Sequence, residues 1–256
     1  MAIDYFGLFP CEVRKSITND ELLGKIKARN QANAALDVMR KNPHPDCSKP
    51  ESEWTVRTMT LTLDGPKEQI VRIHDLLREA EPLDTLSTHC STCAMNVRNT
   101  AFGCGGAIHY PISAQAERWL VSRLPADIES PAGALVTRAI ADFGYDGSVI
   151  DAGRQRKEFY QADEAVERKW GGFLRKKTRI NSSQILQMAF AVGSLQASHA
   201  KMIAYFTGFL DDTFALAEIA SNLPPPDDDA GTVELKLFFR VAALAGARDV
   251  PVFIDA

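Results

Sequence analysis

The sequence contains no run of apolar residues long enough to cross a membrane. Its most apolar stretch, residues 185–210, is interrupted by the polar side chains of Gln187, Gln196, His199 and Lys201, whereas a spanning helix needs about 18 consecutive apolar residues. The first residues also lack the basic and apolar regions of a secretory signal peptide. We therefore expect no membrane partner and a cytoplasmic location.

Several motifs of well-understood chemistry are also absent. The sequence has no phosphate-binding G-x-x-x-x-G-K-[ST] loop and no G-x-S-x-G nucleophile motif. It has no H-E-x-x-H zinc motif, and no H-x-E followed by the P-C-x-x-C of zinc deaminases. Internal repeats and low-complexity tracts are missing as well. The sequence therefore indicates no catalytic residue, and whether the protein is an enzyme stays open.

The overall composition is that of an ordinary globular chain. Of the 256 residues, 45% are hydrophobic and 24% charged, which excludes a disordered or collagen-like protein. The 33 acidic residues outnumber the 29 basic ones, so the formal net charge is −4. This balance disfavours a generally basic nucleic-acid binder.

Periodicity predicts an α+β fold that is mainly helical. Residues 1–112 form an α+β part with a small β-hairpin and a cysteine-bearing irregular segment, and residues 113–256 form a helical part. We expect one compact unit. The helices predicted after residue 112 cover 114–123, 130–143, 149–161, 163–176, 183–192, 196–209, 213–220 and 232–245. The apolar tail at 250–254 is expected to dock on the body or to pair as an edge strand.

The first part carries sharper local signals. Thr18 and Glu21 have the spacing of a capping box, and apolar residues recur at helical spacing over 19–40, so a helix is predicted there. Residues 54–63 alternate like a strand, and Asp64-Gly65 marks a turn. We expect the chain to return as the second strand of a hairpin over 69–73, with a helix taking over by His74. The rival reading is a helix that starts at Pro66.

Three cysteines and two histidines lie in the irregular stretch 81–112. Cys90, Cys93, Cys104 and His109 have the spacing C-x2-C-x10-C-x4-H. A C-x2-C pair can bring two thiolates to one ion, and three cysteines with one histidine form a usual zinc ligand set. A metal would also order an otherwise long structureless segment. The sequence thus predicts a metal-binding protein in which these four residues hold a structural zinc.

The ligand set and the cofactor leave alternatives open. The fourth ligand is His109, His89, Cys11 or Cys47. Thiolates amid glycines also suit an iron–sulfur cluster, which would make Cys90, Cys93 and Cys104 the centre of an enzyme or redox sensor. The same cysteines could instead be buried, unliganded residues. A dithiol redox pair is a weaker reading, because no strand–helix context surrounds the C-x2-C step.

The function that this site implies is a binding or adaptor protein. Its helical part would offer a surface to a protein or small-molecule partner. A zinc-containing nucleic-acid binder is the remaining alternative, because the basic residues Arg175, Lys176, Lys177 and Arg179 follow two aromatic residues. The plainer interpretation of this basic run is the solvated end of a helix.

Overall fold

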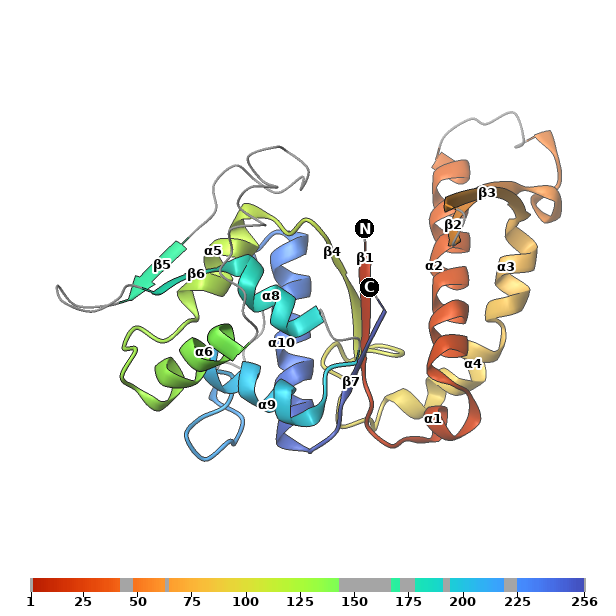
Figure 1. Cartoon of the computed structure of the whole chain (residues 1–256). Coiled ribbons are helices and arrows are strands. Elements are labelled where there is room, and N and C mark those ends of the chain that lie inside the picture. The colour runs from red at the N-terminus through yellow and green to blue at the C-terminus, as the bar shows by residue number, and fades with distance from the viewer. Residues whose placement is uncertain are drawn as a thin grey trace. The chain divides into compact units, whose positions relative to one another are not determined.

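The computed structural model describes residues 2–41, 48–62, 65–142, 167–170, 178–190, 194–218 and 225–255 (Figure 1). Helices dominate this part of the chain and its sheets have two or three strands, which confirms the predicted mainly helical α+β class. The chain divides into two units. The sheet unit consists of Met1–Phe9 and Thr92–Ala256, and the hairpin unit of Pro10–Ser91. This division differs from the predicted change at residue 112, because the first strand pairs with segments far along the chain.

The sheet unit is built on strands from both ends of the chain. β1 (Ala2–Gly7) lies between β4 (Gly105–His109) and β7 (Val252–Asp255), and both pairings are antiparallel. The expectation that the tail pairs as an edge strand is thus confirmed. α10 (Ala230–Ala247) packs beside this sheet (Figure 1). Its apolar face forms the core of the unit, because burying large aromatic side chains is strongly favourable.

Four further helices belong to the described part of this unit: two pack directly on α10, and the other two pack mainly on these. They are α5 (Ala114–Ser122), α6 (Pro131–Asp142), α8 (Ser182–Phe190) and α9 (Ala197–Phe206). All four were predicted. Side-chain caps begin two of them: Ser113 Oγ accepts from the N–H of Ala116 at 3.1 Å, and Asn181 Oδ1 accepts from the N–H of Gln184 at 3.0 Å.

Two predicted helices are wrong where the structure describes them. Within 163–176 the described residues form a strand, β5 (Glu167–Trp170), which pairs with β6 (Thr178–Asn181). No helix begins at Thr213, because Asp211 Oδ1 accepts the N–H groups of Thr213 at 2.8 Å and Ala215 at 3.0 Å and closes a tight loop instead. The helix predicted over 149–161 lies outside the described residues.

The hairpin unit contains one long helix, a β-hairpin and several short helices. In chain order these are α1 (Glu12–Ser16), α2 (Asn19–Lys41), η2 (Glu51–Glu53), β2 (Thr55–Thr62), β3 (Gly65–Arg72), α3 (Ile73–Ala80), α4 (Pro82–Ser87) and η3 (Thr88–Cys90). The predicted hairpin is confirmed, and the helix that follows it starts at Ile73. The rival helix from Pro66 is not formed.

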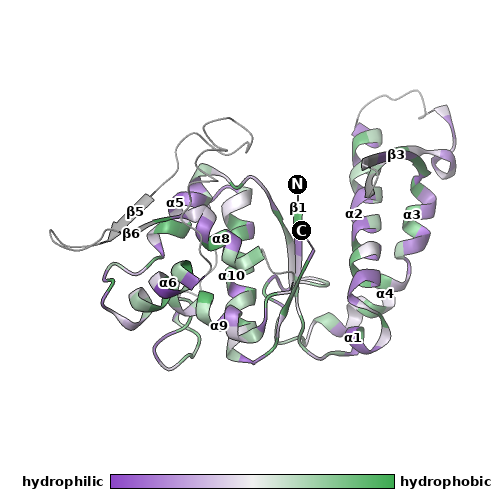
Figure 2. Cartoon of the chain, in the orientation of Figure 1, coloured by the Kyte–Doolittle hydropathy of each residue, from purple (hydrophilic) through white to green (hydrophobic). Residues whose placement is uncertain are grey.

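The capping box at the start of α2 forms as its spacing predicted. The N–H of Thr18 donates to Glu21 Oε2 at 3.0 Å, and the N–H of Glu21 donates to Thr18 Oγ1 at 3.3 Å. Hydrophilic and hydrophobic positions alternate along α2 in Figure 2, as expected for a helix that buries one side. That side packs with Trp54, Ile73 and Leu76 in a small core of its own.

Candidate functional site

The four predicted metal ligands do not form a metal site. Among the described residues, no group of three or more histidine, cysteine, aspartate or glutamate side chains is placed to hold a metal ion. Cys90 is buried in the hairpin unit, whereas Cys93, Cys104 and His109 belong to the sheet unit. The prediction of a metal-binding adaptor, iron–sulfur enzyme or zinc-containing nucleic-acid binder is therefore wrong.

The physical reason is that ligand spacing describes only local chain geometry. Here the chain passes from one unit to the other inside the C-x2-C step, between Ser91 and Thr92. Of the alternative fourth ligands, Cys11 directly precedes α1, His89 is an exposed residue of η3, and Cys47 is outside the described residues. The cofactor expectation, zinc or alternatively an iron–sulfur cluster, is not tested by this geometry and stays a prediction of the sequence.

The structure describes little of the basic run that was predicted to bind nucleic acid. Arg175, Lys176 and Lys177 lie outside the described residues, and only the backbone of Arg179 is described, in β6. The prediction about this run therefore stays untested.

The side chain of Arg98 connects the cysteine-bearing loop of the sheet unit to its neighbouring elements. Arg98 donates from Nη1 and Nη2 to the two carboxylate oxygens of Glu234 on α10, at 2.9 and 2.5 Å. Arg98 Nε donates to the carbonyl of Gly105 at 2.9 Å, and Nη2 reaches the Tyr5 hydroxyl at 3.2 Å. Such two-pronged pairing is stronger than a single ion pair. One side chain thus ties the loop to β1, β4 and α10.

In this cluster, Tyr5 and Arg98 are suited to holding structure through hydrogen bonds. Burial raises the pKa of Tyr5 far above its ordinary value. Burial alone would lower the pKa of Arg98, but its hydrogen bond to Glu234 and the nearby Tyr5 hydroxyl raise that pKa overall. Both groups therefore keep their protons across the physiological range. A group that never changes its protonation state cannot act as a general acid or base.

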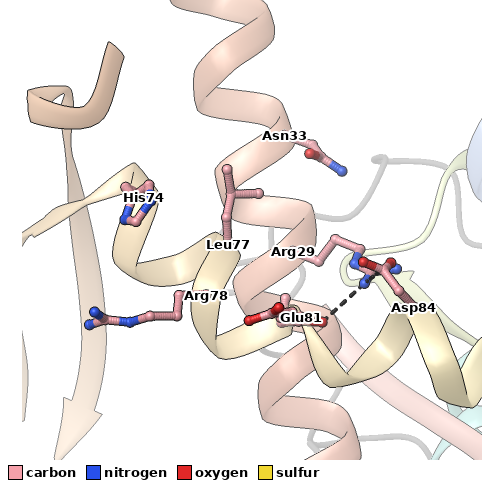
Figure 3. Close-up of a pocket in the computed structure, with 8 residues that line it drawn as sticks. Arg29, Asn33, His74, Leu77, Arg78, Glu81 and Asp84 are labelled. Carbon is pink, nitrogen blue, oxygen red and sulfur yellow. Dashed lines mark hydrogen bonds and ion pairs between the residues drawn. The ribbon is translucent and has the colours of Figure 1, made fainter. Parts of the chain in front are cut away.

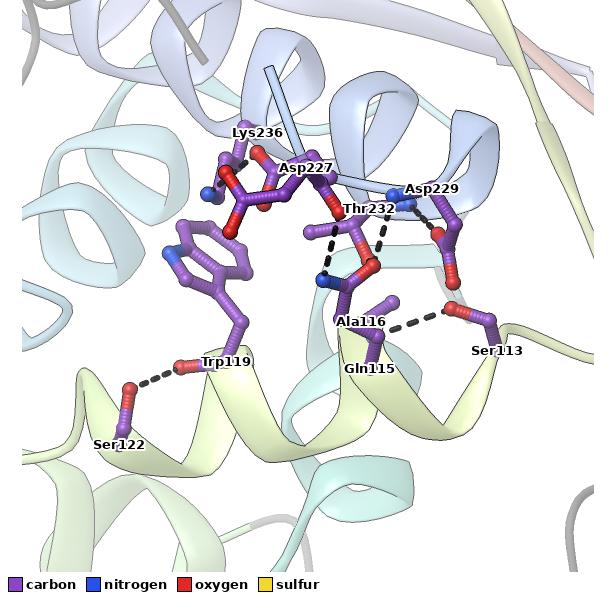
Figure 4. Close-up of polar contacts among 10 residues, drawn as sticks. Ser113, Gln115, Ala116, Trp119, Ser122, Asp227, Asp229, Thr232 and Lys236 are labelled. Atoms are coloured by element: carbon purple, nitrogen blue, oxygen red, sulfur yellow. Dashed lines mark hydrogen bonds and ion pairs between the residues drawn. The ribbon is translucent and has the colours of Figure 1, made fainter. Parts of the chain in front are cut away.

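A second polar cluster, between α5 and α10, is also structural (Figure 4). The side chain of Gln115 accepts from the N–H of Asp229 at 2.6 Å and donates to the carbonyl of Asp227 at 3.3 Å. Lys236 pairs with Asp228 at 2.6 Å, and its ammonium lies 5.5 Å from the centre of the Trp119 ring. These contacts fasten the segment that leads into α10 onto α5, so the groups are satisfied within the fold.

A groove in the hairpin unit is a concave site whose lining residues all lie in the described part of the chain. It has a volume of about 620 Å³ and lies where α2 faces α3 and α4 (Figure 3). Its lining is polar except for Leu77 and Ala80. The lining residues are Arg29 and Asn33 from α2, His74, Leu77, Arg78 and Ala80 from α3, and Glu81 and Asp84 from the start of α4.

Arg29 is fixed in the wall of this groove. Its Nη2 donates to the carbonyl of Ala80 at 3.0 Å and to Asp84 Oδ1 at 2.7 Å. Lys25, one turn earlier on α2, donates to the neighbouring carbonyl of Glu79 at 3.3 Å. Cationic side chains are favoured at the C-terminal end of a helix, and here they cap α3. Because both Arg29 bonds use Nη2, the described residues provide no partner for its Nε and Nη1.

The remaining groove charges have both signs. Arg78 pairs with Asp75 at 3.1 Å, and 68% of its side chain stays exposed. Glu81 adds a carboxylate to the lining, and the carboxylate of Asp84 is the one that pairs with Arg29. A site that offers both donors with positive charge and acceptors with negative charge is complementary to a ligand that carries both charges.

Sequence reasoning did not find this groove. The sequence identified His74 only as the place where a helix follows the hairpin, and no spacing rule links the lining residues of α2 to those of α3. The available signal was weak: Lys25, Arg29 and Asn33 follow one another at four-residue steps and so lie on one side of α2.

Comparison with known proteins gives no independent indication of function. No protein-family model, curated protein or solved structure matches this chain. Within the described residues, no helix is both long enough and apolar enough to pass through a membrane. The functional argument therefore rests on the groove itself.

Proposed function

We propose that the α2–α3–α4 groove binds a small zwitterionic ligand of the amino-acid or short-peptide class. The observation that carries this proposal is Arg29. Its guanidinium is held in place through one nitrogen while its other donors face no described partner. A pre-oriented guanidinium is the preferred protein group for a carboxylate, because its planar fork matches the two oxygens.

Other lining residues of the groove are suited to the ammonium end of the ligand. Glu81 would accept a hydrogen bond from an ammonium group, and Leu77, whose exposed fraction is 37%, offers a small apolar contact. A volume of about 620 Å³ lies within the usual range for small-ligand sites. Because the site is open to solvent, we expect a dissociation constant of about 1 mM.

Calorimetric titration of the full chain with the dipeptide alanylalanine tests this function. N-acetylation of the dipeptide removes its ammonium charge, and C-amidation removes its carboxylate charge. We expect each blocked form to bind about tenfold more weakly, as one lost charged hydrogen bond would cause. Equal binding of the three forms would show that the groove charges do not recognise the ligand.

Two variants of the protein complete this test. Glu81→Gln removes a groove carboxylate that has no side-chain hydrogen bond to any residue that the structure describes, so it should weaken binding several-fold without unfolding the chain. Glu53→Gln is the matched control, because Glu53 is an exposed glutamate of the same unit outside the groove. Arg29→Gln should abolish binding, with circular dichroism used to confirm that α2 and α3 remain folded.

Two predictions about location and partners accompany the proposal. The cysteine usage of the sequence supports a cytoplasmic protein. The sequence placed a protein or small-molecule partner on residues 113–256, whereas the groove belongs to residues 10–91; a partner of the helical part therefore remains a separate prediction. Binding of nucleic acid at Arg175, Lys176, Lys177 and Arg179 is not part of the proposal.

A further inference from the structure

The β-hairpin of the hairpin unit has strand edges without a strand partner. β2 and β3 form a two-stranded sheet, and among the described residues no third strand pairs with either. Each strand is eight residues long. Open edges of this length expose backbone donors and acceptors that favour pairing with another strand.

One face of the hairpin is also unusually apolar for a surface. Met59 and Ile70 are 74% and 68% exposed. They lie on the same face, because Met59 is opposite Glu68 and Ile70 is opposite Arg57 in the strand register. The other face contributes Val56 and Val71 to the small core of the unit. The exposed face is therefore the one whose apolar residues have no cover in the described structure.

The charges along the two strands favour β3 as the strand that pairs. β2 has Arg57 as its one charged residue, so two copies of β2 side by side would offer no ion pair. β3 carries Glu68 and Arg72 on the exposed face, two residues to either side of Ile70. An antiparallel pair of β3 strands related by a two-fold axis at Ile70 brings each Glu68 opposite the Arg72 of the other copy.

At no other residue within 68–72 would a two-fold axis bring opposite charges together. An axis at Glu68 or at Arg72 would bring two like charges together, which is destabilising. An axis at Gln69 would place Glu68 opposite Ile70, and an axis at Val71 would place Arg72 opposite Ile70. The sequence of β3 is therefore self-complementary in one register only.

We propose that two copies of this chain associate through the outer edge of β3, with Ile70 against Ile70 and Glu68 against Arg72 of the second copy. The two hairpins then form one four-stranded antiparallel sheet, in the order β2, β3, β3, β2. Met59 and Ile70 of both copies form an apolar band across it, since diagonal neighbours on adjacent strands are within reach. A ladder of five residues per copy is short, so the dimer is weak, with a dissociation constant of about 1–100 µM.

Charge reversal in the full chain tests both the interface and its register. Sedimentation equilibrium should show a concentration-dependent dimer. Glu68→Arg and Arg72→Glu should each raise the dimer dissociation constant about tenfold, and the double variant should restore it to within about threefold of the original. Far-ultraviolet circular dichroism confirms that the hairpin folds in each variant, since Glu68 and Arg72 also pair with Arg57 and Asp75 within the chain.

Cysteine cross-linking provides an independent readout of the same register. Ile70→Cys would place two thiols across the two-fold axis, so mild oxidation should convert the protein to a disulfide-linked dimer on a non-reducing gel. Val38→Cys is the matched control, because Val38 is an exposed apolar residue on α2, 58% accessible. Three outcomes would each overturn the proposal. The chain could stay monomeric at 1 mM, roughly tenfold or more above the expected dissociation constant. The double variant could fail to restore the dimer, or the cysteine at position 38 could cross-link as well as the one at position 70.

Discussion

Removing the guanidinium group of Arg98 should loosen the cysteine-bearing loop of the sheet unit. In Arg98→Met the stem remains, but the bidentate pair with Glu234 and the bonds to Gly105 and Tyr5 are lost. Breaking a fully buried ion pair costs about 3–5 kcal/mol, because the remaining charge is left unpaired. The Arg98 and Glu234 side chains are 22% and 25% exposed, so we expect a smaller loss, about 2–4 kcal/mol in the free energy of unfolding.

Native-state hydrogen exchange measures this loss where it should occur. The N–H of Val97 donates to the carbonyl of Gly103, and the N–H of Gly7 donates to that of Cys104; both amides should lose protection in Arg98→Met. Arg138→Met is the control, because the Arg138–Asp142 pair is exposed and should contribute less than about 1 kcal/mol. A loss of protection at Val97 that is no larger in Arg98→Met than in Arg138→Met would show that Arg98 does not hold the loop.

A double-mutant cycle separates the interaction energy of Arg98 and Glu234 from the energy of their other contacts. Glu234→Gln removes the carboxylate charge that Arg98 binds while keeping a side chain of similar shape. If the two residues act together, the double variant should be less destabilised than the sum of the single variants by at least about 1 kcal/mol. Additive effects would show that Arg98 acts through its other hydrogen bonds.

Three further outcomes follow from single contacts. Thr18→Ala should lower the helix content and cost about 1 kcal/mol in urea unfolding, because it removes one half of the capping box with Glu21. Gly106→Ala should be destabilised by more than 1 kcal/mol on the same urea scale, as roughly expected for overpacking, because a Cβ there would overlap the Arg98 guanidinium. Hydrogen bonds to Asp229 outweigh its burial and lower its pKa. The stability that this shift contributes is present above the unfolded pKa of about 4 and is lost as pH falls. Asp229→Asn should therefore weaken the dependence of the unfolding free energy on acidic pH, as measured by urea titration.

Local patterns predicted the elements whose cause is local. The capping box of Thr18 and Glu21 and the alternation over β2 each depend on neighbouring residues, and both appear as expected. Asp211 shows the limit of such signals. The same carboxylate that can cap a helix can also close a turn, and the sequence does not reveal which backbone N–H groups it will meet.

Pairings between distant segments were out of reach of the sequence pattern. Nothing in β1 indicates that its neighbours are residues 105–109 and 252–255, so the division of the chain into two units was not predicted. The cysteines illustrate the same limit, since their spacing suggested one site while the unit boundary falls between Cys90 and Cys93. The groove likewise forms only when α2 meets α3 and α4.

The most direct test of the proposed function is a map of amide chemical-shift changes as alanylalanine is added to the isotope-labelled full chain. The groove predicts saturable changes at the amides of Arg29, Asn33, Leu77 and Ala80, with little change in the sheet unit. The changes should vanish in Arg29→Gln and persist in Glu53→Gln. No saturable change at concentrations well above the expected constant of about 1 mM, or changes centred elsewhere, would contradict the account.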